Sequence, residues 1–210
     1  TATTRTVQFN ITQSWRKTAY FPLATNAIGQ TFNVGPFSFG DASSANVILT
    51  VTSQNNTEDW IVGTVTLTKT YTTLSNVTAS FSGCCRISTL LEGQNDDNFL
   101  AQTVVTLSDP TNASPVTNTP PILYVQTGLA AATVQINATD PDNDPLTFSL
   151  ATTAQNGMAP AVPSIVTSLS STGLLTLNTV GKGIGNIQLL YKNLLISSCL
   201  ILIIGLQVIF

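Results

Sequence analysis

The sequence contains no histidine and very little charge. Charged residues make up 8% of its 210 residues, whereas about a quarter is usual in a soluble domain. Without histidine, neither a Ser-His-Asp nor a Cys-His catalytic arrangement can form within the chain. The glycine-rich stretch at residues 181–185 also lacks the spacing of a phosphate-binding loop. We therefore expect the protein not to be an enzyme.

Basic residues are especially scarce. Lysine and arginine total seven against ten acidic residues, which gives a net charge of −3 and a pI of about 4.5. Binding to a phosphate backbone depends on lysine and arginine, so we expect no nucleic-acid partner. Low charge also weakens the repulsion between molecules. Such a surface is typical of a protein that is glycosylated or packed against copies of itself.

Cysteine is nearly absent, and the three cysteines do not form a metal-binding pattern. They are Cys84, Cys85 and Cys199, with no CxxC pair and no histidine to complete a zinc site. All three are disulfide candidates, and one is left over if pairing is intramolecular. An odd cysteine in a secreted chain indicates an intermolecular bond or a buried thiol. The polar start at Thr1 carries no leader, as expected of a mature secreted form.

Threonine, serine and asparagine supply the polarity that charged residues do not. One result is a set of five Asn-x-Ser/Thr sequons, each a possible glycan acceptor in a secreted protein. The alternative is that a chain rich in asparagine and threonine contains sequons by chance. The sequons begin at Asn10, Asn55, Asn76, Asn112 and Asn137.

The distribution of apolar residues predicts an all-β fold. Val7, Phe9 and Ile11 alternate with polar residues, which is the period of a half-buried strand. Threonine also favours strands because its side chain is β-branched. Short strands separated by turn residues are typical of a sandwich. In the first half the predicted strands are residues 5–12, 45–52, 60–68, 76–82 and 98–107.

A proline-rich stretch divides the chain. Residues 109–121 contain four prolines and almost no apolar side chains, a composition that favours an extended linker. We therefore predict two tandem antiparallel β-sandwich domains, at residues 1–109 and 122–210, joined by a linker at residues 110–121. Strands are expected in the second half at residues 122–125, 131–138, 171–178 and 186–191 and after the turn at residues 140–145.

Two motifs in the second half resemble the cadherin-like and related immunoglobulin-like repeats of extracellular proteins. The first is DPDNDPLTFSL, starting at Asp140, and the second is STGLLTLN, starting at Ser171. The resemblance covers roughly residues 117–188 and implies a Greek-key sandwich outside the cell. The first half resembles no family in this way. The inter-repeat DxNDN motif and the LDRE-type stretch of cadherins are missing.

The resemblance also implies a possible calcium site. Calcium binds six to eight oxygen ligands, and Asp140, Asp142 and Asp144 could supply several, helped by Asn143 and Asp109. The alternative is turn chemistry, in which the Asx side chains bond to their own backbone.

Aromatic side chains near the N-terminus offer a possible stacking surface for a glycan. Trp15, Trp60, Tyr20 and Phe21 are the candidates. Trp60 begins a predicted strand, so its expected role is core packing, whereas the role of Trp15 stays open.

The last seventeen residues, 194–210, are uncharged and strongly apolar. A membrane helix needs about 20 such residues, and a lipid-anchor signal would be removed from the mature protein. Strands buried on both faces fit the sequence better. A strand from this apolar run, or the strand at residues 5–12, could complete the sheet of a neighbouring copy.

The main prediction is therefore a structural subunit of an extracellular filament or surface coat. The alternative is an adhesion or glycan-binding module of a larger surface protein.

Overall fold

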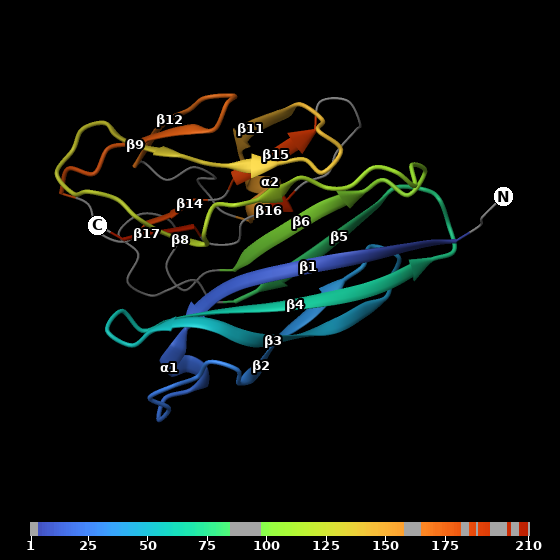
Figure 1. Cartoon of the computed structure of the whole chain (residues 1–210), viewed down its shortest axis with the longest axis horizontal. Helices are drawn as coiled ribbons and strands as arrows, with labels where there is room; N and C mark the ends of the chain where they lie inside the picture. Colours follow the sequence, from blue (N-terminus) through green and yellow to red (C-terminus); the bar gives the residue numbers. More distant parts are fainter. Residues whose placement is uncertain are drawn as a thin grey trace.

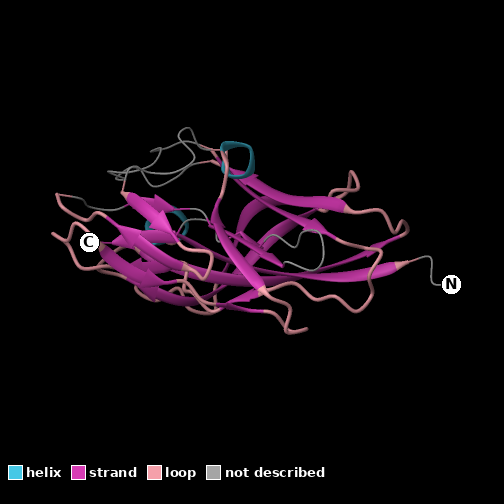
Figure 2. Cartoon of the chain, turned by 90° about the horizontal axis from the view of Figure 1, so that it is seen from above, coloured by secondary structure: helices cyan, strands magenta, loops and turns pink. Residues whose placement is uncertain are grey.

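The computed structural model describes residues 4–84, 98–157, 165–181, 185–187, 189–193, 201–202 and 206–209. These residues form a predominantly β structure (Figure 2). The two helices among them are α1 (Lys17–Tyr20) and α2 (Thr153–Asn156). Within the same residues, no helix has the length and apolarity needed to cross a membrane.

The strands of the first half are long and share one sheet. They are β1 (Arg5–Arg16), β2 (Thr31–Ser38), β3 (Ser44–Asn55), β4 (Trp60–Tyr71), β5 (Val77–Gly83) and β6 (Phe99–Val105). The sheet order is β1-β4-β3-β2-β5-β6, and every pair is antiparallel. The five strands predicted in this half are confirmed. Residues 31–38, whose glycine and proline favour turns, are also a strand, with an irregular register between Asn33 and Pro36.

The sheet curls so that one face encloses an aromatic core. The buried set alternates along each strand as the sequence predicts; in β3 it is Val47, Leu49 and Val51. The curl brings the two edge strands together at their ends. The rings of Trp15 in β1 and Phe99 in β6 have centroids 5.8 Å apart. At the other end, the Arg5 Nε donates a hydrogen bond to the Leu107 carbonyl at 3.2 Å.

Tyr71 closes the core at the end of β4. Its side chain is 1% exposed, and its hydroxyl donates to the Phe39 carbonyl at 2.8 Å. Burial, together with the nearby Asp41 carboxylate, raises the pKa of Tyr71 to about 12. Asp41 in turn forms an ion pair with Lys69 at 2.8 Å, and hydrogen bonds from Lys69 and Ser43 lower the pKa of Asp41 to about 2.

The strands of the second half are short and fall into several small sheets. They are β7 (Val116–Thr117), β8 (Ile122–Tyr124), β9 (Ala132–Gln135), β10 (Ala138–Thr139), β11 (Leu146–Leu150), β12 (Val166–Leu169), β13 (Leu174–Leu177), β14 (Gly185–Ile187), β15 (Leu189–Asn193), β16 (Ile201–Leu202) and β17 (Leu206–Ile209). The sheets have the orders β10-β7, β11-β15-β16, β12-β13-β9 and β14-β17-β8. The pair β17–β8 is parallel, so this half is not wholly antiparallel.

The second half lies along the β6 side of the curled sheet (Figure 1). The Gln102 Nε2 in β6 donates to the carbonyl of Ala154 in α2 at 3.2 Å. At another point, the Trp60 Nε1 in β4 donates to the hydroxyl of Tyr124 in β8 at 3.3 Å. Contacts therefore join the two halves at both β6 and the β3–β4 hairpin.

The stretch predicted as a linker takes part in these contacts. Val116 and Thr117 pair with β10 as strand β7. Thr119 is 8% exposed, and its hydroxyl donates to the Asn137 carbonyl at 3.2 Å and accepts from the Asn137 amide at 2.9 Å. The predicted domain border stays a prediction. The all-β architecture is confirmed, but two tandem antiparallel sandwiches are not, because the first half is one curled sheet and the second contains a parallel pair.

Candidate interaction groove

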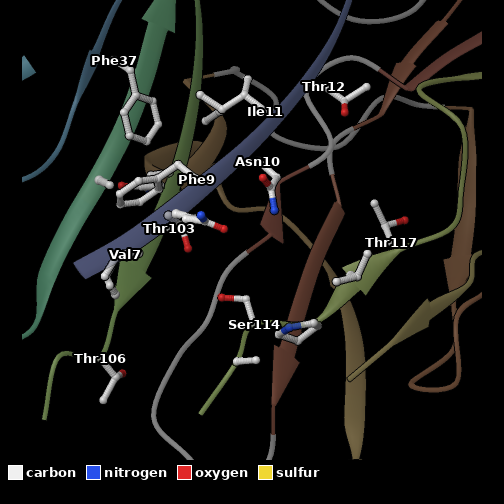
Figure 3. A pocket seen from close by; sticks show the side chains of 18 of the residues that line it. Val7, Phe9, Asn10, Ile11, Thr12, Phe37, Thr103, Thr106, Ser114 and Thr117 are labelled. Atoms are coloured by element: carbon white, nitrogen blue, oxygen red, sulfur yellow. The ribbon is translucent and has the colours of Figure 1, made fainter. Parts of the chain in front are cut away.

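A groove of about 710 Å³ runs along the edge strand β1. Its walls are β1, β6 and residues 109–121, which lead from the curled sheet into the second half. Figure 3 shows Asn10 and Thr12 on β1, with Ser114 and Thr117 on the opposite side. The groove therefore lies where the two halves of the chain meet.

The groove combines an apolar floor with a polar rim. Phe9, Phe37 and Phe81 reach it from the core, with 5.1 Å between the ring centroids of Phe9 and Phe37. Because side chains alternate along a strand, the intervening residues of β1 face outward. The polar rim consists of Thr6, Gln8, Asn10, Thr12, Gln102, Thr103, Thr106, Asn112, Ser114, Thr117 and Thr119.

Among the described lining residues, Arg5 and Asp109 are the charged ones, and both are engaged. Arg5 bonds to the Leu107 carbonyl. The Asp109 Oδ1 accepts hydrogen bonds from the Thr111 amide at 2.9 Å and the Thr111 hydroxyl at 2.8 Å. These bonds lower the pKa of Asp109, with a smaller contribution from the charge of Arg5. The rest of the groove is electrically neutral.

Two polar atoms in the groove-lining residues are buried without a hydrogen-bond partner among the described residues. They are the Gln13 Nε2, a donor, and the Asn112 Oδ1, an acceptor. Gln13 is 1% exposed, and its other amide atom accepts from the Trp15 Nε1 at 2.9 Å. Buried polar groups are nearly always paired, and an unpaired one costs about 1–3 kcal/mol.

The three aspartates predicted to bind calcium form a turn. The Asp140 Oδ1 accepts from the amides of Asp142 at 2.9 Å and Asp144 at 3.4 Å. The Asp142 Oδ2 accepts from the Ala113 amide at 2.5 Å. Asn143 adopts a left-handed φ of 62°. In the described part of the chain, no three His, Cys, Asp or Glu side chains are grouped to hold a metal ion.

The Asp140 side chain bonds to the amides that follow it, which is the geometry of an Asx turn. The Asp140 Oδ2 is nevertheless buried without a partner among the described residues. Calcium binding stays a prediction.

The two motifs that carry the cadherin-like resemblance lie side by side. The Phe148 amide donates to the Ser171 carbonyl at 3.3 Å, and the Ile136 amide donates to the Gly173 carbonyl at 2.9 Å. Gly173 has a φ of +89°, and a Cβ there would lie 2.5 Å from the Ile136 carbonyl oxygen. The second motif needs glycine at this turn for both reasons.

The structure gives Trp15, whose role was open, a place on the core, whereas Trp60, for which core packing is expected, contacts the second half. Trp15 packs on the core through edge contacts with Tyr20 and Phe99, at centroid distances of 5.7 and 5.8 Å. Trp60 instead lies at the junction of the halves, where its Nε1 donates to the Glu58 carboxylate at 2.9 Å. Tyr124 donates to the same carboxylate. Tyr20 and Phe21 pack against Phe32, and the glycan-stacking surface stays a prediction.

Several predicted residues lie partly or wholly outside the described residues. Cys84 is disulfide-bonded, while the other two candidates, Cys85 and Cys199, lie outside. The described parts of the apolar run at residues 194–210 are the strands β16 and β17. Of the sequon asparagines, Asn10, Asn76 and Asn137 are exposed, and Asn55 and Asn112 are half-buried.

Sequence reasoning did not identify Gln13 or Asn112 as residues of a site. Gln13 lies on the same inward-facing side of β1 as Val7, Phe9 and Ile11. A polar amide in this otherwise apolar alternation is the feature of the sequence that could have pointed to it. The sequence indicates Asn112 only as a sequon, and nothing local in it indicates that the side-chain carbonyl is buried.

The curled sheet is also the part of the chain that matches a known protein family. Residues 1–108 match the family model described as "Integrin beta-like protein A-E, N-terminal". The chain belongs to this family of integrin beta-like proteins.

Relatives include integrin beta-like proteins E, C and A of Dictyostelium discoideum. The chain is 33% identical to protein E over 156 residues, 31% to protein C over 161 and 29% to protein A over 181. These alignments cover 70%, 69% and 79% of this chain but only 8%, 8% and 9% of the relatives. No solved structure matches the chain.

Proposed function

We propose that this chain is one module of a much longer cell-surface protein with a role in adhesion, and that it is not an enzyme. The match of residues 1–108 to the N-terminal model of the integrin beta-like family carries this proposal. The alignments cover less than a tenth of the relatives' length, as expected of a module. The low charge and the sequons support an extracellular location.

The groove along β1 is the binding site in this proposal. Its rim of hydroxyl and amide groups favours hydrogen bonding, and its phenylalanine floor favours contact with an apolar face. With its few charges engaged, the groove suits an uncharged ligand. A neutral glycan has this chemistry.

Binding to an array of neutral and acidic glycans, with the purified chain, tests the proposal. We expect neutral glycans to bind and Thr103→Val, which removes a hydroxyl from the groove wall, to weaken binding about threefold to tenfold. Thr50→Val is the matched control, because Thr50 is an exposed threonine in β3 that does not line the groove. Equal loss in both variants, or a preference for acidic glycans, would contradict the assignment of the groove.

A filament or coat subunit that polymerises with copies of itself is the second candidate. It requires a strand available for donation to a neighbour. The strand at residues 5–12 would have to leave its partner first, because β1 pairs with β4 of the same chain from Arg5 to Arg16. Electron microscopy of the concentrated chain distinguishes the candidates: regular polymers favour the filament, and monomers favour the adhesion module.

A further inference from the structure

The five sequons of this chain occupy different surroundings in the folded protein. In N-glycosylation, the asparagine Nδ2 displaces a pyrophosphate from C1 of a lipid-linked oligosaccharide. The N–C1 bond forms, the C1–O bond breaks, the lipid pyrophosphate leaves and the amide loses one proton. A glycosylated asparagine must therefore project its Nδ2 into space large enough for a sugar. A chain modified at a buried position cannot reach the native packing, so the secreted, folded fraction is bare there.

Asn76 and Asn137 meet this requirement. Asn76 is exposed and lies in the connection between β4 and β5. Asn137 is exposed between β9 and β10, and its backbone is fixed: its carbonyl accepts from the Asn118 amide at 3.0 Å. Neither asparagine is among the described residues that line the groove. A sugar on either one would extend into solvent and leave these contacts intact.

Asn55 does not meet the requirement, because both atoms of its amide hold the β3–β4 hairpin. Its Oδ1 accepts from the amides of Thr57 at 2.9 Å and Glu58 at 3.1 Å. Its Nδ2 donates at 2.9 Å to the Glu58 carboxylate that also binds Trp60 and Tyr124. A sugar on this nitrogen would have to enter the cluster that joins the two halves.

Asn112 and Asn10 line the groove. The Asn112 Oδ1 is buried, and the neighbouring Ala113 amide is bonded to Asp142. Asn10 is exposed, but its side chain points into the groove toward the wall that carries Ser114 and Thr117 (Figure 3). Its Oδ1 accepts a hydrogen bond from the hydroxyl of Thr66, its cross-strand partner in β4, at 2.8 Å. An oligosaccharide on either residue would have to fit between β1 and residues 109–121 in a groove of about 710 Å³, which is too small for its many sugar units, so these walls could not pack as they do.

We infer that N-linked glycans occupy Asn76 and Asn137, and that Asn10, Asn55 and Asn112 are bare in the secreted, folded protein. This inference rests on the proposed cell-surface location, since the reaction occurs in the secretory pathway. The consequence is a glycosylated surface with an open groove.

The test is expression of the full chain with a secretion signal in a eukaryotic host. Enzymatic release of the glycans in heavy-oxygen water converts each modified asparagine to a labelled aspartate, and mass spectrometry of the peptides locates it. We expect label at Asn76 and Asn137 alone. Thr78→Val and Thr139→Val keep both asparagines but remove the sequon hydroxyls, so each should lower the intact mass by one glycan. The matched controls Thr12→Val and Thr57→Val should leave the glycan mass unchanged.

A glycan on Asn55, Asn112 or Asn10 in the secreted monomer, or an unmodified Asn76 or Asn137, would overturn the inference. Peptide mapping of the unaltered chain gives this answer even if a variant fails to fold. The proposed function fails in a different way: the chain would carry its attached glycans at the expected positions but would not bind a glycan through the groove.

Discussion

The two halves of the chain bury their apolar side chains in different ways. The first half uses strands of 7–12 residues in one sheet, and its core includes phenylalanines from four strands. The described core of the second half is a small aliphatic group: Ile136, Ile165, Leu175 and Leu177. Its described strands are 2–5 residues long. Since stabilisation grows with the apolar area removed from water, the first half should fold on its own, and the second should depend on contacts with β6.

The strongest test of this contrast deletes one core side chain in each half. Phe81 is 2% exposed, and its ring lies 5.7 Å from Phe99; Phe81→Ala should cost about 3–5 kcal/mol and unfold both halves together. Leu175 is fully buried, and Leu175→Ala should cost about 2–5 kcal/mol but open only the second half. Hydrogen exchange separates these outcomes. Loss of protection in β3 in the Leu175 variant would show that the halves are one cooperative unit.

Glycine substitutions give a finer comparison, because each half contains a crowded left-handed glycine. A Cβ would lie 2.4 Å from the Thr78 carbonyl oxygen at Gly40, and 2.5 Å from that of Ile136 at Gly173. Alanine at either position should cost about 2–4 kcal/mol. Gly29 is the control, with a φ of +82° and no atom within 4 Å of a Cβ, so Gly29→Ala should cost only about 1–2 kcal/mol. Denaturant unfolding measures all three, and equal costs would mean that crowding is unimportant.

The smallest expected effect concerns pH and is confined to the first half. Tyr71→Phe removes the hydrogen bond to Phe39 and should cost about 0.5–1.5 kcal/mol. Because the folded-state pKa of Tyr71 is raised from 10.0 to about 12, its contribution is complete below pH 10 and is lost as the pH rises through about 12. Unfolding free energies measured across this range should fall more steeply in the unaltered chain than in Tyr71→Phe. Parallel curves would contradict the pKa shift.

The same contrast explains how much of the fold the sequence predicts. In the first half, apolar and polar residues alternate over enough positions in each long strand to show which face is buried, as in β1, where Val7, Phe9 and Ile11 point inward. The two-residue β7 and the four-residue β12 contain too few alternations to be recognised, although β9 and β13, also four residues long, fall within predicted strands. The pairing of β7 with β10 depends instead on Thr119 and Asn137, which are distant from each other in sequence.

The groove was less predictable than the fold. The local sequence pattern identifies the asparagines and aspartates around the groove, but it does not show which of their polar atoms have hydrogen-bond partners. The Asp140 turn uses its own following amides, a local arrangement that the sequence does suggest. The burial of Asn112, by contrast, follows from the position of the second half against β1, which no short stretch of sequence encodes.

The contact between Trp60, Glu58 and Tyr124 has a practical consequence. The Trp60 indole donates to the Glu58 carboxylate of its own half and to the Tyr124 hydroxyl of the other half. Its fluorescence should change when either acceptor moves away. Trp15 packs against Tyr20 and Phe99 at the edge of the first half's core, so its emission should change only when the curled sheet itself melts. The chain thus contains two natural optical reporters, one for separation of the halves and one for loss of the first half's core.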